Sequence, residues 1–442
     1  ILRLAQEDHV VAVTLHHISA DGASLAPFAR DTAIAYAARS GGRTPEFVPL
    51  PIQFADVTVW QHLLLGDESD PRSVAARQLE YWRNRLAGLP PRLDLPTDRP
   101  RPTVASMRGG TVDSGIDVET FAAVRRLAAD TGTTPFMVVQ AVFAVLLARL
   151  STRTDIAVGT PVAGRVDPAL DDLIGMFVGT LVLRTEVRPG ERFRDLLERV
   201  RRDDTEDFAH ADLPFERLVD ALAPTRSAAH HPLVQVGFSY QNLPSTDLKL
   251  AGLDAEVLDL PLGVAKFDLH LTAVEDVLDS TRTHLRLQWD HALDLFDADT
   301  VRMTAERFEI VLREVLAHPD TVVGDIDLRT AAGSRIAARL DGDRTDLPSV
   351  TLPELLADQW SRSPHAPALV FDDHSLDYAG FASRVVALAQ RLIETGVRPE
   401  TRVAVALRRG LALPVALCAV LVAGGAYVPI DPDAPGERTA HI

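Results

Sequence analysis

Apolar residues near the start of the chain follow two different periods. Residues 9–15 (His-Val-Val-Ala-Val-Thr-Leu) are almost all apolar or β-branched, a pattern typical of a strand buried on both faces. After the polar turn at residues 16–22 the spacing becomes helical, with Leu25, Phe28 and Ala29 on one face. The sequence therefore predicts a turn whose side chains are held in place by a buried strand and a helix.

Alternating helical and strand patterns continue downstream. A helix carrying Trp60 and another over 71–88 precede a proline-rich stretch, 89–102, which must be extended because proline lacks an amide donor. Asp117 has N-cap character, and Pro135 is placed to open a helix. The pattern predicts strands over 111–116, 156–159, 180–187, 234–242, 267–274 and 284–290, the last two antiparallel, and helices starting at 117 and covering 135–150, 193–208, 214–222 and 297–316.

A second unit is expected after a region of weak periodicity. Residues 319–350 have the composition of a linker with one short helix near 334–340. Beyond it, strands alternate with helices, which indicates a parallel sheet. The expected elements are helices over 351–363, 378–395 and 410–423, strands over 368–371 and 403–407, and the edge of a turn at 375–378.

Composition narrows the class of protein. A chain of 442 residues suggests two or three domains, and 46% hydrophobic with 24% charged residues is typical of soluble globular proteins. The formal charge of −17 disfavours nucleic acid or an anionic membrane as a partner. The apolar stretch 411–423 is too short to span a bilayer. The single cysteine, Cys418, lies in an apolar helical pattern and is expected to be a buried small hydrophobe, which favours a reducing, cytoplasmic setting.

The turn at 16–22 (His-His-Ile-Ser-Ala-Asp-Gly) contains several residues that could take part in catalysis. A histidine titrates near neutrality and can accept a proton from a nucleophile. Asp21 is expected to act as a tether that pairs with an arginine elsewhere, and Gly22 to permit a positive φ or an exposed N–H. Two unrelated histidines and a helix-capping aspartate are the alternative explanation, and spacing alone does not decide between them.

Six segments in order resemble condensation domains of nonribosomal peptide synthetases. The turn at 16–22 resembles the family's His-His-x-x-x-Asp-Gly motif. Segment 174–181 is similar to Ile-Gly-x-Phe-Val-Asn-Thr-Leu, with Gly179 in place of asparagine. The other similar segments are 54–60 (with Phe and Thr in place of Tyr and Ala), 78–82, 93–100 and 210–216, followed by the His-Pro-Leu turn at 231–233.

The resemblance implies an α/β, two-lobed chloramphenicol-acetyltransferase-like fold. It implies that residues 1–67 are the remainder of the amino-terminal lobe and 68–320 the carboxy-terminal lobe, with a linker over 321–350. Residues 351–442, which contain Leu-Val-Ala-Gly-Gly-Ala-Tyr-Val-Pro-Ile-Asp-Pro at 421–432, resemble the start of an adenylation domain. Because the chain opens on Ile1 and lacks the family's earliest segments, we expect it to be a piece of a longer protein.

The resemblance also implies the chemistry. Its reaction is amide formation between two thioesters on the 4′-phosphopantetheine arms of upstream and downstream peptidyl carrier domains of the synthetase. His17 is expected to be the catalytic imidazole and the Gly22 N–H a cavity donor. His16 and Asp21 are expected to be structural, with the His16 ring turned into the strand–helix junction and Arg165 pairing with Asp21. No cofactor is expected on these residues, since ATP and Mg²⁺ belong to the complete adenylation domain, and Gly424-Gly425 is expected to be a packing turn.

The sequence also agrees with other interpretations of its function. An epimerisation domain or a coenzyme-A-dependent acyltransferase shares the motif, and a catalytically silent docking module would agree with Gly179. His210 and Asp212 are expected to serve capping and packing, and the turn at 230–231 to be structural. Trp60 and Trp82 are expected in the core, and the charged run at 203–208 on a solvated helix face.

Overall fold

A computed structural model describes residues 1–222, 227–242, 250–258, 260, 262–278, 282–340 and 349–441. The chain divides into two compact units, Ile1–Arg339 and Leu340–Ile442. The expected linker begins inside the first unit, because Val323 and Ile326 are buried in its main core. The boundary between two lobes at 67/68 stays a prediction.

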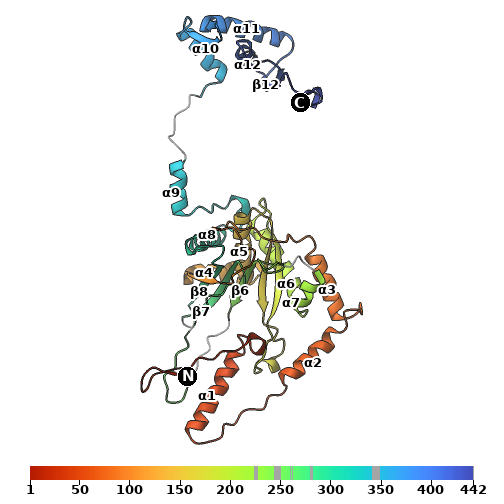
Figure 1. Ribbon diagram of the computed structural model, residues 1–442, viewed down its shortest axis with the longest axis vertical. Helices are drawn as coiled ribbons and strands as arrows, with labels where there is room; N and C mark the ends of the chain where they lie inside the picture. Colours follow the sequence, from red (N-terminus) through yellow and green to blue (C-terminus); the bar gives the residue numbers. More distant parts are fainter. Residues whose placement is uncertain are drawn as a thin grey trace. The chain divides into compact units, whose positions relative to one another are not determined.

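A six-stranded mixed sheet forms the centre of the first unit (Figure 1). Its spatial order is β3-β8-β7-β6-β4-β5, and the β4–β6 and β6–β7 pairs are parallel while the other pairs are antiparallel. The expected antiparallel pair is present as β7 and β8. The strands are β3 Gly109–Ile116, β4 Asp155–Val162, β5 Gly179–Glu186, β6 Val236–Gln241, β7 Leu269–Val277 and β8 Thr283–Ala292.

Four described helices cover one face of this sheet. The other face is apolar over β4 and β5, where residues such as Ala157 belong to a second core cluster, and polar over β7 and β8. The covered face contributes residues such as Phe238, Leu271 and Trp289, each fully buried, to the main core. Because side chains alternate along a strand, the neighbouring positions Thr272 and Gln288 lie on the open face. The covering helices are α4 Val118–Thr131, α5 Pro135–Ser151, α6 Phe193–Phe208 and α8 Ala298–Ala317.

Local signals set where these helices begin. The Asp117 carboxylate accepts a hydrogen bond from the Thr120 N–H at 2.8 Å, and the Thr134 hydroxyl accepts from the Met137 N–H at 3.3 Å. Pro135 occupies the first turn of α5, where its missing N–H costs nothing. Between the two helices, Gly132 adopts the left-handed conformation that ends α4. These caps agree with the helix starts that the sequence predicts.

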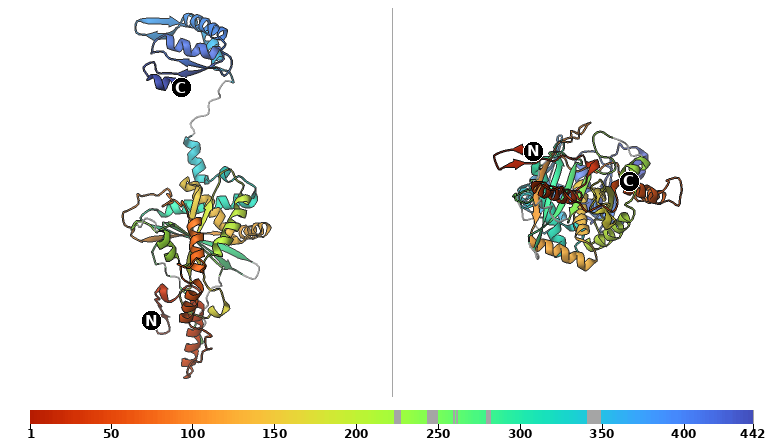
Figure 2. Two further views of the ribbon diagram at one scale, coloured as in Figure 1. Left: turned by 90° about the vertical axis from the view of Figure 1, so that its right-hand side faces the viewer. Right: turned by 90° about the horizontal axis from the view of Figure 1, so that it is seen from below.

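The amino-terminal segment differs from its prediction. The expected buried strand over 9–15 is a strand only at β2 (His9–Val10), and Val11 and Val13 are 64% and 54% exposed. Within the described chain β2 pairs with β1 at two residue positions and is not part of the six-stranded sheet. Helix α1 extends away from the sheet (Figures 1 and 2). The elements are β1 Leu2–Arg3, η1 His17–Ser19, α1 Leu25–Ser40, α2 Phe54–Leu65 and α3 Val74–Arg85.

Two other predictions about this unit are wrong. Within the charged run at 203–208, Asp204 and Asp207 are 2% and 0% exposed, because α6 turns this side toward α3 and α5. Trp82 is buried as expected, whereas Trp60 on α2 is 47% exposed. The remaining elements of the unit are η2 Pro168–Leu170, α7 Phe215–Leu222, η3 Val323–Asp325 and α9 Ala331–Leu340, whose last residue falls at the unit boundary.

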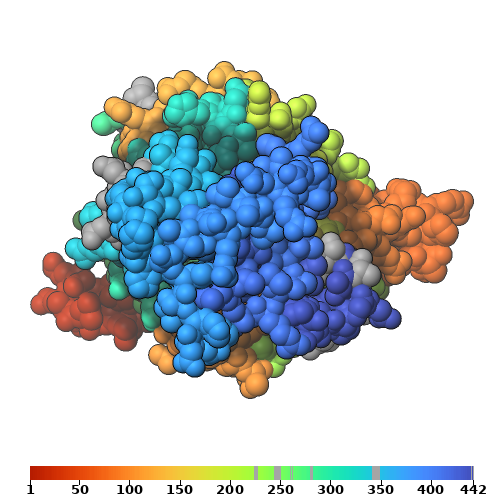
Figure 3. Space-filling view, turned by 90° about the horizontal axis from the view of Figure 1, so that it is seen from above, coloured from red at the N-terminus to blue at the C-terminus, as the bar shows by residue number. Residues whose placement is uncertain are grey.

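The second unit has its own core around Phe381, Val385 and Ala419. β11 and β12 are parallel, as the alternation predicts, but residues 374–377 form strand β10 in an antiparallel hairpin with β9 rather than the edge of a turn. Cys418 is partly buried against this core. One face of the unit appears in blue in Figure 3. Its elements are α10 Leu352–Arg362, β9 Pro367–Phe371, β10 His374–Asp377, α11 Tyr378–Glu394, β11 Arg402–Val405, α12 Ala412–Val422, β12 Ala426–Pro429 and α13 Gly436–His441.

Close packing explains the glycine pair of this unit. Gly424 has a φ of +84°, and a Cβ on Gly425 would lie 2.9 Å from the Thr401 carbonyl oxygen. Both positions therefore require glycine for the turn between α12 and β12. This agrees with the expected packing turn.

Candidate active site

The two histidines of the turn at 16–22 are exposed. His16 is the N-cap of the short helix η1, and its Nδ1 accepts a hydrogen bond from the Ile18 N–H at 3.1 Å. This bond orients the ring along the turn, so His16 is not packed into the strand–helix junction as expected. His17 is the first residue of η1, which presents its ring to solvent.

Directly after the histidines, Asp21 anchors the turn to the rest of the unit. Its side chain is fully buried and lies 3.0 Å, Oδ1 to Nη2, from Arg165, whose side chain is 6% exposed. The Ser24 hydroxyl donates to Oδ1 at 2.7 Å, and the Phe177 N–H donates to Oδ2 at 3.1 Å. The expected pair of Asp21 with Arg165 is therefore present as a buried contact between segments far apart in the sequence.

Burial and hydrogen bonding act on the Asp21 carboxyl in opposite directions. Burial raises its pKa, but the hydrogen bonds from Ser24, Phe177 and Arg165 together lower the pKa below its ordinary value. Asp21 is thus held as a carboxylate, and its charge is matched by the Arg165 guanidinium. Such a charge-assisted contact fixes the position of the turn more strictly than neutral contacts would.

Ser24 was not singled out in the sequence, although it sits at the centre of the anchor. Its hydroxyl accepts from the Gly175 N–H at 3.2 Å and from Arg165 Nη2 at 3.1 Å, while it donates to Asp21. Ser24 is 1% exposed. The available signal was its place three residues after Asp21 and just before α1, where serine and aspartate often satisfy free amides.

Aromatic contacts bring a third segment to the anchor. The Arg165 guanidinium lies 4.1 Å from the centre of the Phe177 ring, and Phe177 packs edge-on against Phe54 at 5.1 Å. Gly175 leaves room for Phe54, since a Cβ on Gly175 would lie 2.2 Å from its ring. The segments at 16–22, 54–60 and 174–181 therefore converge around Arg165.

Gly22 behaves differently from its prediction. Its φ lies outside the left-handed region, and a Cβ would meet nothing within 4 Å. Neither backbone conformation nor packing therefore requires glycine at this position, and its exposed N–H has no acceptor among the described residues.

The other polar candidates make packing contacts. The His210 ring stacks on Tyr81 with centroids 3.8 Å apart, and Asp212 accepts a hydrogen bond from Gln78 at 2.7 Å. His231 packs between Phe215 and Phe267, where burial lowers its pKa despite hydrogen bonding to backbone groups. All three side chains hold neighbouring elements together rather than facing the turn at 16–22.

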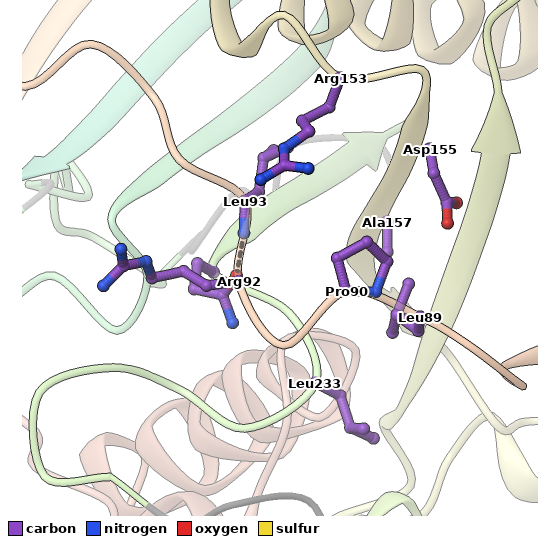
Figure 4. A pocket seen from close by; sticks show the side chains of 9 residues that line it. Leu89, Pro90, Arg92, Leu93, Arg153, Asp155, Ala157 and Leu233 are labelled. Carbon is purple, nitrogen blue, oxygen red and sulfur yellow. Dashed lines mark hydrogen bonds between the residues drawn. The ribbon is translucent and has the colours of Figure 1, made fainter. Parts of the chain in front are cut away.

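A hollow beside the proline-rich stretch is too small for a substrate. It lies between Leu93 and the start of β4 at Asp155 (Figure 4) and has a volume of about 10 Å³, enough for about one water molecule. The Leu93 N–H donates to Gln235 Oε1 at 2.9 Å along one wall.

The described residues contain neither a metal-binding cluster nor a single helix that could span a membrane. No group of three or more His, Cys, Asp or Glu side chains there is placed to hold a metal ion. No single described helix is long and apolar enough to cross a membrane. Together, the bent pair α4 and α5 has sufficient length and apolar composition. However, α5 lies in the main hydrophobic core.

Comparison with known families agrees with this geometry. The family model "Condensation domain" matches residues 1–335. The chain belongs to the condensation-domain family. A second model, "AMP-binding enzyme", matches residues 356–442, so the condensation domain is followed by the start of an AMP-binding domain.

Curated relatives are much longer than this chain. A dimodular nonribosomal peptide synthase of Bacillus subtilis (strain 168) is 41% identical over 441 residues, which cover 99% of this chain and 18% of that protein. An isonitrile lipopeptide synthase of Mycobacterium tuberculosis is 41% identical over 450 residues, again 18% of its length. The chain therefore spans less than a fifth of either relative.

Solved structures show the same fold. The X-domain from teicoplanin biosynthesis superposes with a TM-score of 0.67 at 34% identity, covering 71% of this chain and 70% of that one. A four-domain nonribosomal peptide synthetase bound to AMP and glycine covers 96% of this chain and 32% of that one, with a TM-score of 0.62 and 25% identity. The α/β condensation fold expected from the sequence is thus confirmed.

Proposed function

We propose that this condensation domain forms a peptide bond between two thioesters, each carried on the phosphopantetheine arm of a carrier domain. The α-amine of the acceptor attacks the thioester carbonyl carbon of the donor, the carbon–sulfur bond breaks, and the thiolate leaves. A thioester is already activated, so no covalent intermediate with the protein is needed. The domain must position the two reactants and handle one proton.

His17 is the proposed proton acceptor for the attacking amine, and the Gly22 N–H the proposed donor to the developing oxyanion. One observation carries this assignment: an exposed imidazole sits on a turn whose position is fixed by a buried carboxylate, Asp21, paired with Arg165. His16, Asp21 and Arg165 would then be positioning residues. A rigid support under a solvent-facing reactive group is what a catalytic turn requires.

The proposed partners are the upstream and downstream carrier domains and the rest of a synthetase, in the cytoplasm. The names of the relatives and the match of residues 356–442 to AMP-binding enzymes support this organisation. Residues 351–442 would be the beginning of an adenylation domain, whose ATP and Mg²⁺ are substrates of the complete domain. We propose residues 68–320 as the carboxy-terminal lobe of the condensation domain.

The test is single-turnover dipeptide formation from two loaded carrier domains by the natural protein that contains this chain. We expect His17→Ala to lower the rate by roughly 10²-fold or more, as for loss of a general base. His210→Ala is the matched control, because that ring packs on Tyr81 away from the turn. A full rate with His17→Ala would contradict the assignment.

A recruiting module is the second candidate function. One of the similar solved structures, at 33% identity, is described as a complex of the X-domain and OxyB from teicoplanin biosynthesis, so a protein of this fold binds another protein there. Gly179, where the family has asparagine, is the departure in this chain that agrees with such a role. A silent module would yield no dipeptide from the unmodified protein, whereas the proposed enzyme would.

A further inference from the structure

The open face of the sheet contains a pocket of about 570 Å³. Its floor is formed by side chains of β3, β7 and β8, among them Asp113, Thr272 and Asp290, and its rim includes Leu262 and Val264. No motif segment discussed above contributes to it. A volume of this size matches sites that bind small molecules or the side chain of a larger ligand.

Residues 262–264 form one wall of this pocket, and backbone hydrogen bonds join this segment to the edge strand β3. The Gly109 N–H donates to the Gly263 carbonyl at 2.8 Å, and the Ala265 N–H donates to the Met107 carbonyl at 3.0 Å. Gly109 has to be glycine here, since a Cβ would lie 2.6 Å from the Val264 carbonyl carbon. The pocket is therefore built by backbone pairing along β3.

The floor is acidic. Asp113 and Asp290 lie on the adjacent strands β3 and β8 in a diagonal register, which places their Cα atoms roughly 7–8 Å apart on one face. Asp290 accepts hydrogen bonds from Thr111 at 2.6 Å and from Gln288 at 3.2 Å. The described part of the chain offers Asp113 no hydrogen-bond or ion-pair partner.

Arg286 is the one basic group among the described residues that line the pocket, and it does not cancel this charge. Its guanidinium is paired with the Asp276 carboxylate at 3.1 Å. Two carboxylates with one already neutralised guanidinium leave a negative potential on the floor. Such a site attracts a cation and repels an anion.

Thr272 supplies an independent sign of a ligand. The residue as a whole is 9% exposed, it lines the pocket on the open face, and its hydroxyl has no hydrogen-bond partner among the described residues. A hydroxyl that reaches into the pocket without a partner in the protein can accept a hydrogen bond from a ligand. The rim residues Leu262 and Val264 are exposed and apolar, so the entrance suits a hydrocarbon stem.

We propose that this pocket binds an aliphatic cation, an ammonium or guanidinium group at the end of a short hydrocarbon chain. The stem lies along Leu262, Val264 and Val274, and the charged head lies between Asp113 and Asp290 with a hydrogen bond to the Thr272 hydroxyl. Two sources share this chemistry. One is the basic side chain of a carrier-bound amino acid, which rests on the proposed function, and the other is a free small amine.

Binding of two matched probes to the purified chain tests the proposal without using activity. Nα-acetyl-lysine methylamide carries the cation, and Nα-acetyl-norleucine methylamide has the same carbon stem without it. By saturation-transfer NMR at low ionic strength we expect the lysine probe to bind about tenfold more tightly, and Asp113→Asn to abolish the difference. Equal binding of the two probes, or no effect of Asp113→Asn, would overturn the proposal.

Two further variants keep the result interpretable. Asp130→Asn makes the same charge change on α4, against the covered face of the sheet, and should leave the preference for lysine intact. Thr272→Val preserves the shape of the side chain and should weaken the lysine probe alone. If Asp130→Asn removed the preference as fully as Asp113→Asn, general charge rather than this pocket would be responsible, and the proposal would fail.

The natural protein distinguishes the two sources. Single-turnover rates are compared for acceptor carriers loaded with lysine or norleucine, with and without Asp113→Asn. A selective loss of at least fivefold with lysine identifies a carrier-bound side chain as the occupant. Probe binding that depends on Asp113, with unchanged rates, identifies a free amine. Absence of any dipeptide would contradict the proposed function and leave the binding result standing.

Discussion

At the scale of single residues, substitution of the buried Asp21 is expected to lower the stability of the fold strongly. Asp21→Ala would leave the Arg165 guanidinium, 6% exposed, without its partner. Removing one member of a buried ion pair typically costs 3–5 kcal/mol. We expect the free energy of unfolding of the first unit to fall by about 3 kcal/mol, as measured by urea titration with tryptophan fluorescence.

An exposed pair provides the control for this prediction. Asp172 pairs with Arg30 on the surface, with 60% and 46% of the two side chains exposed. Exposed pairs are worth roughly 0–1 kcal/mol, so Asp172→Ala should change stability little. If Asp21→Ala kept normal stability but abolished turnover, Asp21 would be catalytic and our assignment of it as a positioning residue would be wrong.

At the scale of elements, the contact between α5 and α6 contains a second buried carboxyl. Asp204 is 2% exposed, and it accepts one hydrogen bond, from Gln140 at 3.1 Å. Burial is the largest influence and raises the pKa of Asp204 to about 7, and the nearby charge of Asp207 adds to it. The folded protein therefore holds a proton here at pH values where the unfolded chain, with an ordinary pKa of 3.8, has lost it.

This difference makes stability depend on pH with a definite sign. Between pH 3.8 and about 7 the folded state binds one proton more than the unfolded state, so stability falls as pH rises and the contribution is gone above 7. Asp204→Asn cannot titrate. We expect the unfolding free energy of the wild type to decrease relative to this variant by roughly 2–3 kcal/mol between about pH 5 and 8, at about 1.4 kcal/mol per pH unit.

Urea titrations of both proteins at several pH values measure the effect. Asp195→Asn, on the same helix but exposed, is the matched control and should follow the wild type. Parallel pH profiles for the wild type and Asp204→Asn would show that the buried carboxyl does not retain its proton.

The sequence predicted most of these elements because their periodicity and caps are local. Helix α6 has the expected bounds, and α4 and α5 begin where Asp117 and Pro135 indicate. The burial of Asp204 could not be predicted, since α6 is charged on several sides and only its tertiary neighbours decide which charges are covered. The exposure of residues 11–15 has the same origin: an apolar run indicates a strand, but burial requires a partner.

The candidate site was predictable in part for a related reason. The resemblance of motif segments led to the pair of Asp21 and Arg165, which periodicity alone would not have joined. Ser24 and the Phe54–Phe177 contact depend on how three distant segments converge, and nothing local encodes that convergence. The pocket over β3 and β8 likewise depends on register, which puts Asp113 and Asp290 on one face only after the strands have paired.

At the scale of the whole molecule, each hydrophobic core cluster among the described residues contains residues of one unit only. The main core and two smaller clusters contain residues of Ile1–Arg339 alone, and the cluster around Phe381 contains residues of Leu340–Ile442 alone. Cooperative unfolding requires shared packing, so each unit should unfold on its own. Matched phenylalanine truncations, Phe308→Ala on α8 and Phe381→Ala on α11, test this directly.

Both rings are at most 4% exposed, and such truncations typically cost 3–5 kcal/mol. Hydrogen exchange with mass spectrometry reports on each unit separately. We expect Phe308→Ala to lower protection of α5, α8 and the central strands only, and Phe381→Ala to lower protection of α11 and α12 only. Because Phe308 and Phe381 each belong to the core cluster of their own unit, loss of protection across the boundary at Arg339 would contradict independent folding.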